Sequence, residues 1–266
     1  MSRQTEIVER GGVDDDVLIR ECTTIEEFDT CVRLQREVFG LPDLELSPRR
    51  HLIVSRRAGG WILGAFEAAG GALVGFVHHL IAARGAEITG YSHMMAVSTA
   101  YQNRGLGARL KWAQRERALA EGRSYISWTF EPMQARNAHF NLNRLGVVVR
   151  SYGVNFYGWD GGTEATASGK QFNLDSDRLI AGWELRTPRV EACARGERPA
   201  HAAAQPAAVV EIPPEWNKLR REDGRAAESE LLRVRSEFQR HFAAGLVCAG
   251  FERDAARPCY LFYSDE

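Results

Sequence analysis

Hydrophobic and polar positions alternate with two different periods along the chain, and the change of period predicts its elements. In the first third, Thr24 followed by Glu27 predicts a capping box that opens a helix, and Gly40 marks the end of that helix. The turn at residues 69–71 indicates a hairpin between two of the strands. The apolar strand-like runs are residues 17–21, 61–68, 72–81 and 87–97. The last three predict an antiparallel meander.

Beyond residue 97 the hydrophobic period changes from two to about 3.6. Leu106, Leu110 and Ala113 recur at helical spacing and predict a helix that ends at Gly122. The elements expected after it are a strand at 125–130, a helix through Ala138, Leu142 and Leu145 that ends at Gly146, and strands at 147–149 and 179–185. Helices that alternate with strands after a meander predict an α/β protein with a mixed sheet, of the α+β kind.

The C-terminal part predicts a small β-α-β-β unit. Phe238 and Phe242 lie on one helical stripe, which we expect to be an internal core, and the strands expected around it are 209–212, 246–251 and 260–263. A unit of about 60 residues is marginally stable alone, so we expect it to pack on the larger part. The expected organisation is a tail at 1–16, a main domain at 17–187, a low-complexity linker at 188–208 and the small unit at 209–266.

Composition excludes several classes of protein. The chain carries 34 basic and 35 acidic side chains, which argues against the positive field of a nonspecific nucleic-acid binder. No apolar run approaches the ~18 residues of a membrane span, and the first residues lack the apolar core of a signal peptide, so a cytoplasmic protein is expected. Five cysteines without a Cys-x-x-Cys pair disfavour a disulfide framework and structural zinc, and we expect no metal.

The segment Gln102–Gly107 (QNRGLG) is the most informative motif. It lies between the strand that ends at Val97 and the helix that follows. Glycines let the backbone approach a bound group, and the first amides of a helix have no partners within it, so this geometry favours a phosphate or pyrophosphate. The motif is neither a Walker loop nor a dinucleotide fingerprint, and by itself it is equally compatible with a tight turn.

In this order of elements the motif resembles the acyl-CoA loop of the GNAT N-acetyltransferase superfamily, Gln/Arg-x-x-Gly-x-Gly/Ala. Gln102, Gly105 and Gly107 occupy the three signature positions, and the resemblance extends over residues 17–158. It implies a GNAT-like acyl-CoA N-acyltransferase fold, with a V-shaped opening beside Val97 for the pantetheine arm. The implied co-substrate is acetyl-CoA or another acyl-CoA, and the implied acceptor is a small-molecule or peptide amine that attacks directly.

The resemblance also assigns cofactor contacts. The amides from Asn103 to Ala108 would hold the pyrophosphate, and the Val97 amide would polarise the thioester carbonyl. Arg104 and Lys111 lie beside the loop and offer charge to CoA phosphates, or else form a solvated helix face. Asn137 resembles a cofactor-contacting asparagine of the family but is displaced by two residues. The cofactor-binding set is Val97, Gln102, Asn103, Arg104, Gly105, Leu106, Gly107, Ala108 and Asn137.

The chain departs from the family at the general acid. Many members have a tyrosine four residues before the glycine that ends the second helix, and this chain has Leu142 there, on the apolar face. The replacements considered are His93, Tyr152 and Tyr157, with His139 as a weaker candidate. A histidine titrates near neutrality, which suits proton transfer. The alternative interpretation is a hydrogen-bonded strand histidine and tyrosines that pack amphipathically.

Three functions follow from these observations. The favoured one is an acyl-CoA-dependent N-acyltransferase, acetyl being the first acyl group to consider. Leu142 motivates the second, a weak or inactive GNAT-like module that binds CoA or another phosphorylated ligand. The third is an interaction protein built on the same fold, whose working surface is the C-terminal unit. Apart from that hypothesis, the function considered for the C-terminal unit is a cap over the acceptor cleft or a homodimer contact.

Overall fold

The computed structural model describes residues 16–160, 174–199 and 205–265. These residues form a mixed α/β protein with seven α-helices in the described part. The chain divides into two compact units between Ile126 and Ser127, inside strand β5 (Tyr125–Phe130). Each unit is described by itself below.

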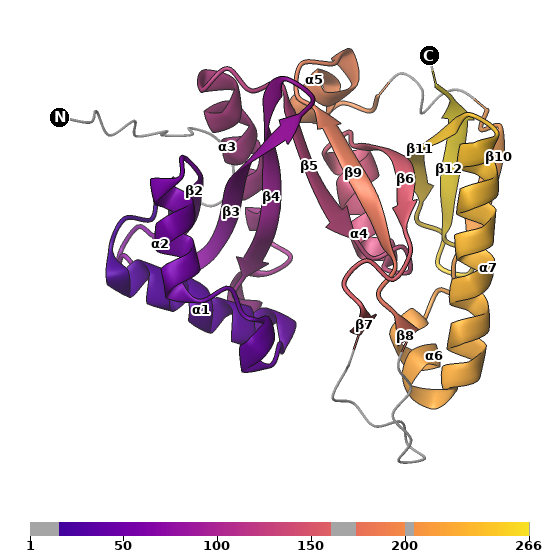
Figure 1. The fold of residues 1–266 in the computed structure, drawn as a ribbon, viewed down its shortest axis with the longest axis horizontal. Helices are drawn as coiled ribbons and strands as arrows, with labels where there is room; N and C mark the ends of the chain where they lie inside the picture. The colour runs from indigo at the N-terminus through magenta and orange to yellow at the C-terminus, as the bar shows by residue number, and fades with distance from the viewer. Residues whose placement is uncertain (1–15, 161–173, 200–204, 266) are drawn as a thin grey trace. The chain divides into compact units, whose positions relative to one another are not determined.

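The first unit is built on an antiparallel sheet in the order β1-β2-β3-β4. The meander expected from the alternating pattern is therefore confirmed (Figure 1). The strands are β1 (Val17–Glu21), β2 (Trp61–Glu67), β3 (Leu73–Arg84) and β4 (Glu87–Val97). The helices are α1 (Ile25–Phe39), α2 (Arg49–Arg57) and α3 (Leu106–Ala120), with short 3-10 turns at Asp43–Glu45 and Thr99–Tyr101.

The helices cover the two faces of this sheet. Helices α1 and α2 share one apolar cluster with the sheet, centred on Phe28, Leu52 and Phe76, and α3 shares the other, through Leu106 and Leu110. The capping box is present, because Thr24 accepts from the Glu27 amide while Glu27 accepts from the Thr24 amide. Gly40 ends α1 at a φ of +61°, a conformation that favours glycine.

Strand β4 contains a β-bulge at His93. His78 lies opposite Met94 and His79 lies opposite Ser92, so His93 is the extra residue. Ser92 contacts Lys111 on the α3 face, whereas Met94 packs on the cluster beneath α1 and α2. The bulge therefore resets the alternation of β4 and turns His93 toward the α2 side.

The second unit has a sheet in the order β5-β9-β6-β11-β12-β10. Its first helix, α4 (Ala135–His139), continues into a π-helical turn (Phe140–Arg144). The strands after β5 are β6 (Val148–Gly153), β9 (Arg178–Glu184), β10 (Ala208–Glu211), β11 (Leu246–Glu252) and β12 (Cys259–Ser264), with β7 (Trp159–Asp160) and β8 (Leu174–Asp175) in a separate ribbon. The remaining helices are α5 (Pro188–Ala194), α6 (Trp216–Glu222) and α7 (Gly224–Ala243).

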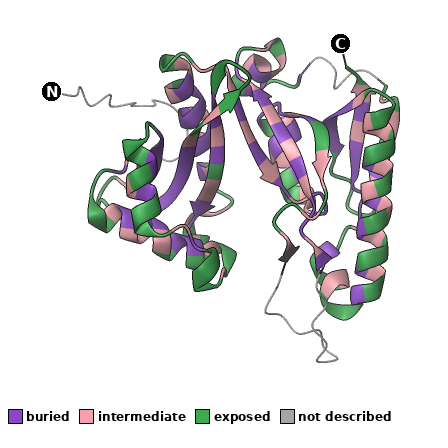
Figure 2. Cartoon of the chain, in the orientation of Figure 1, coloured by how far each residue is buried: buried purple, intermediate pink, exposed green. Residues whose placement is uncertain are grey.

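The C-terminal segment extends this second sheet. Strand β11 pairs with β6 antiparallel, with Cys248 opposite Val149, and β12 and β10 follow. Phe238 is buried against Tyr260 and Phe262, with ring centroids 4.9 and 5.1 Å away, so this residue of the aromatic stripe is core as expected. Phe242 is half-buried beside Phe262, at 5.7 Å between ring centroids. Figure 2 shows α7 buried on its inner side and exposed on its outer side.

Some elements were not expected from the sequence. Helices α2, α5 and α6 are new, and α5 lies inside the segment 188–208 that was expected to be a linker. Residues 1–15 of the expected tail at 1–16 lie outside the described residues. The five cysteines are buried thiols, as expected. In the described part of the chain, no helix combines the length and apolarity that a membrane span requires.

Candidate functional site

The glycine-containing loop follows β4 directly and is tied back to it. The Gln102 side-chain amide donates to the Val97 carbonyl at 3.0 Å. Asn103 then takes a φ of +64° and Gly105 a φ of +83°. These two left-handed residues turn the chain into α3, whose N-cap is Gly105. Gln102 is thus a structural tie of the loop as well as a signature residue.

The start of α3 offers main-chain N–H groups without a capping side chain. Gly105 makes no side-chain cap, and the first intrahelical bonds are those from Ala108 and Arg109 to the Gly105 carbonyl. Among the described residues, no acceptor is found for the amides of Gly105, Leu106 and Gly107. Unpartnered amides at the positive end of a helix form a site for an anion.

The loop has room above its glycines. A Cβ added at Gly105 would meet nothing within 4 Å, and one added at Gly107 would only touch Met95 Cε at 3.4 Å. The space next to both glycines is therefore open in the protein itself. An approaching ligand group could use that space, and a side chain there would block it.

Contacts from α1 and β2 hold the start of the loop. Glu37 Oε1 accepts from the Ser98 hydroxyl at 2.8 Å and from the Thr99 amide at 2.9 Å. These bonds, the Thr99 amide first, lower the pKa of the Glu37 carboxyl. The Tyr101 hydroxyl donates to Glu67. The loop is therefore fixed at both sides of the 3-10 turn.

The backbone of Val97 is directed away from β3. Ser98 donates to the Val74 carbonyl at 2.8 Å, so Val74 and Ser98 form a hydrogen-bonded pair of the antiparallel ladder. The next pair, Gly75 and Val97, is then a non-hydrogen-bonded pair. In such a pair the N–H and C=O groups point outward, which turns the Val97 amide toward the edge of β4 opposite β3.

The two cationic candidates beside the loop differ in their environments. Arg104 is exposed, and its guanidinium carbon lies 5.2 Å from the centroid of the Tyr101 ring. Lys111 is buried, and its ammonium donates to Ser92 at 2.8 Å and to Gln114 at 3.0 Å. Burial lowers the pKa of Lys111 well below its usual value. The solvated face considered for Lys111 is therefore wrong, because the side chain turns into the α3–sheet core.

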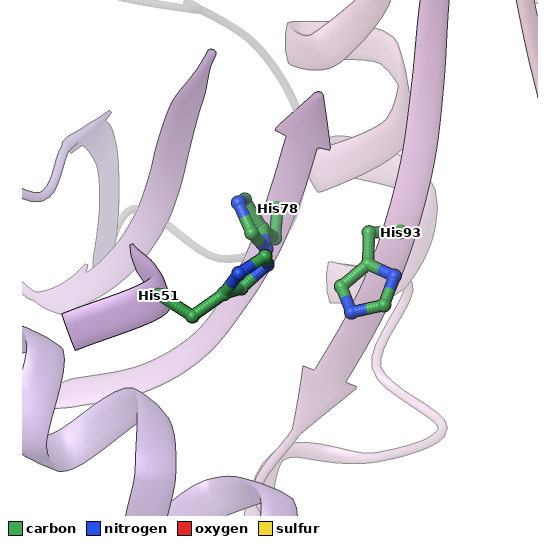
Figure 3. Close-up of side chains that lie close together, drawn as sticks. All are labelled: His51, His78 and His93. Carbon is green, nitrogen blue, oxygen red and sulfur yellow. The ribbon is translucent and has the colours of Figure 1, made fainter. Parts of the chain in front are cut away.

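His93 lies in a cluster of three histidines that was not found by sequence reasoning. The ring of His93 lies 5.4 Å from that of His78 and 5.8 Å from that of His51, between ring centroids. Figure 3 shows the three side chains gathered from α2, β3 and β4. They are separated by 27 and 15 residues in the sequence. No local motif reveals such a cluster, because only the pairing of β3 with β4 and the unexpected helix α2 bring it together.

Two serines hold two of these rings. The Ser47 hydroxyl lies 2.9 Å from His93 Nε2, and the Ser55 hydroxyl lies 2.6 Å from His78 Nε2. His78 is fully buried, and its Nδ1 has no hydrogen-bond partner in the part of the chain that the structure describes. Burial, followed by the nearby His93 and His51, lowers the pKa of His78 to about 3, and burial also lowers that of His93.

Tyr152, in the second unit, belongs to a charged hydrogen-bond network. Its hydroxyl donates to Asp177 Oδ2 at 2.7 Å, and the same buried carboxylate accepts from Arg235 and from the Asn155 amide. Burial and then Asp177 raise the pKa of the Tyr152 phenol. The hydroxyl proton of Tyr152 is therefore engaged by the buried Asp177 carboxylate.

Tyr157 is the accessible tyrosine of the pair. Its side chain is exposed, and its hydroxyl lies 2.9 Å from Thr129 Oγ1. Arg178 lies over the ring, with its guanidinium carbon 5.2 Å from the centroid. The Tyr157 amide donates to Ser176 at 2.8 Å, which fixes the backbone of this segment.

Helix α4 carries the remaining sequence candidates. Asn137 is exposed on the helix, while Leu142 is completely buried, as expected for a core residue. His139 Nδ1 lies 3.2 Å from the Asn143 amide nitrogen, and burial lowers its pKa. Asn143 also exchanges two hydrogen bonds with the backbone of Phe251 in β11. The end of α4 is therefore a structural junction within the second unit.

Comparison with known proteins agrees with the fold. Residues 25–146 match the family model described as Acetyltransferase (GNAT) family. The match covers somewhat less than half of the chain, and it indicates a GNAT acetyltransferase domain over these residues. The match includes α1, the meander, the glycine loop, α3 and α4. No curated protein matches the chain in sequence.

Solved structures show the same architecture at low sequence identity. The NatC complex bound to Gag peptide and CoA matches at 13% identity and a TM-score of 0.50, over 64% of this chain and 98% of its own. The ribosomal-protein-S18-alanine N-acetyltransferase from Escherichia coli matches at 13% identity and a TM-score of 0.49, over 64% of this chain and 95% of its own. A GNAT family acetyltransferase from Elizabethkingia anophelis with acetyl-CoA bound matches at 15% identity and a TM-score of 0.46, over 64% of this chain and 99% of its own. The match to the NatC complex, with its TM-score of 0.50, supports the assignment of the fold.

Proposed function

We propose that this protein is an acyl-CoA-dependent N-acyltransferase that transfers an acyl group, acetyl first, directly to an amine of a small molecule or peptide. The observation that carries the proposal is the loop between β4 and α3. It combines two left-handed residues, unpartnered amides and open space above two glycines, in a domain of the GNAT family.

The residues of the loop suit the pyrophosphate of an acyl-CoA. The amides of Gly105, Leu106 and Gly107 supply donors at the positive end of α3, and exposed Arg104 adds a cation. Asn103, Ala108 and, on α4, Asn137 complete the proposed contacts. Gln102 contributes through its bond to Val97 rather than through the ligand.

The Val97 amide is the proposed oxyanion donor. Attack of an amine on a thioester carbonyl places negative charge on the carbonyl oxygen, and a positioned N–H stabilises that charge by about 3–4 kcal/mol in comparable acyl transfers. The pairing of Val97 with Gly75 turns this N–H away from β3, as the role requires.

His93 is the proposed acid–base group. An ammonium acceptor must lose a proton before it attacks, and a neutral imidazole can accept that proton. The lowered pKa of His93 favours the neutral form. The bulge in β4 and the Ser47 hydroxyl orient its ring.

Tyr157 is the preferred candidate for protonating the departing thiolate. Its phenol is exposed, and its hydroxyl hydrogen-bonds the neutral hydroxyl of Thr129. Tyr152 was considered for the same role. Its bond to Asp177 supports a positioning role, holding the segment that carries Tyr157.

A second candidate function is a GNAT-like module that binds CoA without transferring an acyl group. The complete burial of Leu142 favours it, because the position of the family's usual acid is filled by core. The two functions differ in one measurable property, which is the release of CoA thiol that depends on an added amine.

The test begins with ligand binding. Acetyl-CoA and longer acyl-CoAs are titrated into the full chain by calorimetry, and thiol release is then followed with panels of small amines and of peptides with free N-termini. Binding with amine-dependent thiol release supports the transferase. Binding without release against every amine supports the second function, and no binding at millimolar ligand refutes both.

Gly107→Ala provides the matched variant. A methyl group there makes only an ordinary contact with Met95, so folding should be kept, while the approach of the pyrophosphate should be blocked. We expect acetyl-CoA affinity to fall about tenfold or more, equivalent to at least about 1.4 kcal/mol. Gly122→Ala lies beyond the far end of α3 at a φ of +79°, where alanine is strained, so it is the control for a destabilising glycine substitution: stability should fall while acetyl-CoA affinity stays unchanged.

A further inference from the structure

We propose that His51, His78 and His93 form a binding site for a divalent transition-metal ion, with Zn²⁺ as the reference ion. The site was not expected from the sequence, and metal binding to it can be measured without an acyl-transfer assay. One ligand atom from each histidine lies within 4.8 Å of the other two. Imidazole nitrogen is the protein ligand that Zn²⁺, Cu²⁺ and Ni²⁺ share.

The orphaned nitrogen of His78 is the strongest evidence for a ligand. His78 is fully buried, its Nε2 is bonded to Ser55, and its Nδ1 has no partner among the described residues. A buried polar atom without a partner destabilises the folded protein, because its lost hydration is not replaced. A metal ion at Nδ1 would remove that cost, and the buried side chain keeps the lone pair available for it.

The serines provide the outer support that metal sites use. A ligating histidine commonly donates its other N–H to an acceptor that fixes the tautomer and the ring orientation. Ser55 stands in that relation to His78, and Ser47 to His93. Ser47 is itself held by the buried Gln35, whose amide exchanges two hydrogen bonds with the Ser47 backbone at 2.8 and 3.1 Å.

The geometry requires only a modest contraction. Zn–N bonds of 2.0–2.1 Å in a tetrahedral site place the nitrogens about 3.3 Å apart. His78 and His93 project from paired strands, so they form the rigid side of the site. His51 is exposed on α2 and has the freedom to close onto them. Three nitrogen ligands leave the fourth position of the metal for water or another ligand.

The three imidazole rings also lie against one another. They are edge to face, at interplanar angles of 64°, 76° and 84°. Figure 3 shows the three rings close together. Histidines that only fill space would gain more from an apolar neighbour than from two other imidazoles.

The test measures metal binding directly. The full chain without a polyhistidine tag is stripped with a chelator and titrated with Zn²⁺ by calorimetry, and with Co²⁺ by visible absorption. We expect one ion per chain and the absorption bands of a tetrahedral Co²⁺ centre. An absence of stoichiometric binding of either ion would overturn the proposal.

Variants locate the ion. His51→Ala changes an exposed side chain and should leave the fold intact while it weakens Zn²⁺ binding by about tenfold or more. Ser55→Ala should weaken binding in the same direction through His78, and it provides a second measurement if a His78 variant fails to fold. His139→Ala, in the second unit, is the matched control and should keep full affinity. Equal affinity in wild type and His51→Ala would show that the ion binds elsewhere.

Metal binding and acid–base catalysis would compete for the same ring. A metal at His93 takes the lone pair that proton transfer requires, so the two states of the cluster exclude each other. The metal titration has its own readout, and a chain that binds Zn²⁺ but never releases thiol would leave this proposal standing while the transferase failed.

Discussion

The Gln102 side chain donates to the Val97 carbonyl at 3.0 Å and joins the glycine loop to the last residue of strand β4. The carbonyl and amide of Val97 share one orientation relative to β3, so the bond also fixes the proposed oxyanion donor. Replacement by Leu should remove about 1 kcal/mol of stabilisation and allow the loop to move. We expect a larger loss in acetyl-CoA affinity than in the free energy of unfolding.

Gln102→Arg is the matched control for this bond. Arginine occupies the same signature position in the resembling family and carries donors that can reach a carbonyl. Calorimetry with acetyl-CoA should show affinity retained in Gln102→Arg and reduced in Gln102→Leu. Equal affinity in wild type and both variants would show that the Gln102–Val97 hydrogen bond does not contribute to acetyl-CoA binding.

Leu142→Tyr should destabilise the protein instead of supplying the missing acid. The leucine side chain is completely buried, and a larger side chain in a packed core costs about 1–3 kcal/mol. Urea denaturation should show a lower midpoint, and thiol release should not accelerate. Leu142→Met, which conserves volume, should cost less than about 1.5 kcal/mol. A faster reaction in Leu142→Tyr would show that this position does reach the reacting groups.

Stability of the metal-free protein should fall on acidification. Burial, followed by neighbouring charged groups, lowers the pKa of both His78 and His79 to about 3. The unfolded chain binds these two protons near pH 6.5 and the folded chain only near pH 3, so stability is lost as the pH falls between these values. Each histidine contributes a slope of up to about 1.4 kcal/mol per pH unit.

Denaturant unfolding at several pH values in this range measures that slope. His79 stacks on Trp61 at 4.0 Å, and His79→Gln should lower overall stability but also flatten the pH dependence. The slope of stability against pH, and not the absolute stability, tests whether His79 stays neutral in the folded protein. A slope unchanged in His79→Gln would contradict it.

Tyr152→Phe and Tyr157→Phe should separate structure from chemistry. Loss of the Tyr152 hydroxyl removes one donor from buried Asp177 and should cost about 1–2 kcal/mol of stability, with a small effect on turnover. Loss of the exposed Tyr157 hydroxyl should leave stability nearly unchanged and reduce turnover. Parallel thermal melts and thiol-release rates test both, and the reverse pattern would exchange their roles.

The sequence predicted most of the strands because their alternation and turns are local signals. Strands β1 and β4 and the capped helix α1 appear where their patterns placed them. Helix α2 was missed because its pattern is mainly charged, with buried residues only at Leu52 and Ser55. The π-helical turn after α4 was missed because a single added residue leaves the hydrophobic stripe almost unchanged.

The candidate site was predictable only where it is continuous in sequence. The loop could be recognised from Gln102, Gly105 and Gly107 because its function depends on backbone conformation. The histidine cluster could not, because its members come from three elements and one of them stands at a bulge. A period-two pattern contains no information about where an extra residue will enter a strand.

The pairing of β11 with β6 has a consequence for how the interaction hypothesis can be examined. Removal of the chain from Val209 onward would strip β6 of its neighbour and leave a row of unpaired main-chain groups beside the apolar Val149. Such an exposed sheet edge promotes self-association. A truncated protein that fails to bind a partner would therefore report on aggregation as much as on recognition. Point substitutions at exposed positions of α7, Leu232 for example, preserve the sheet and test the surface alone.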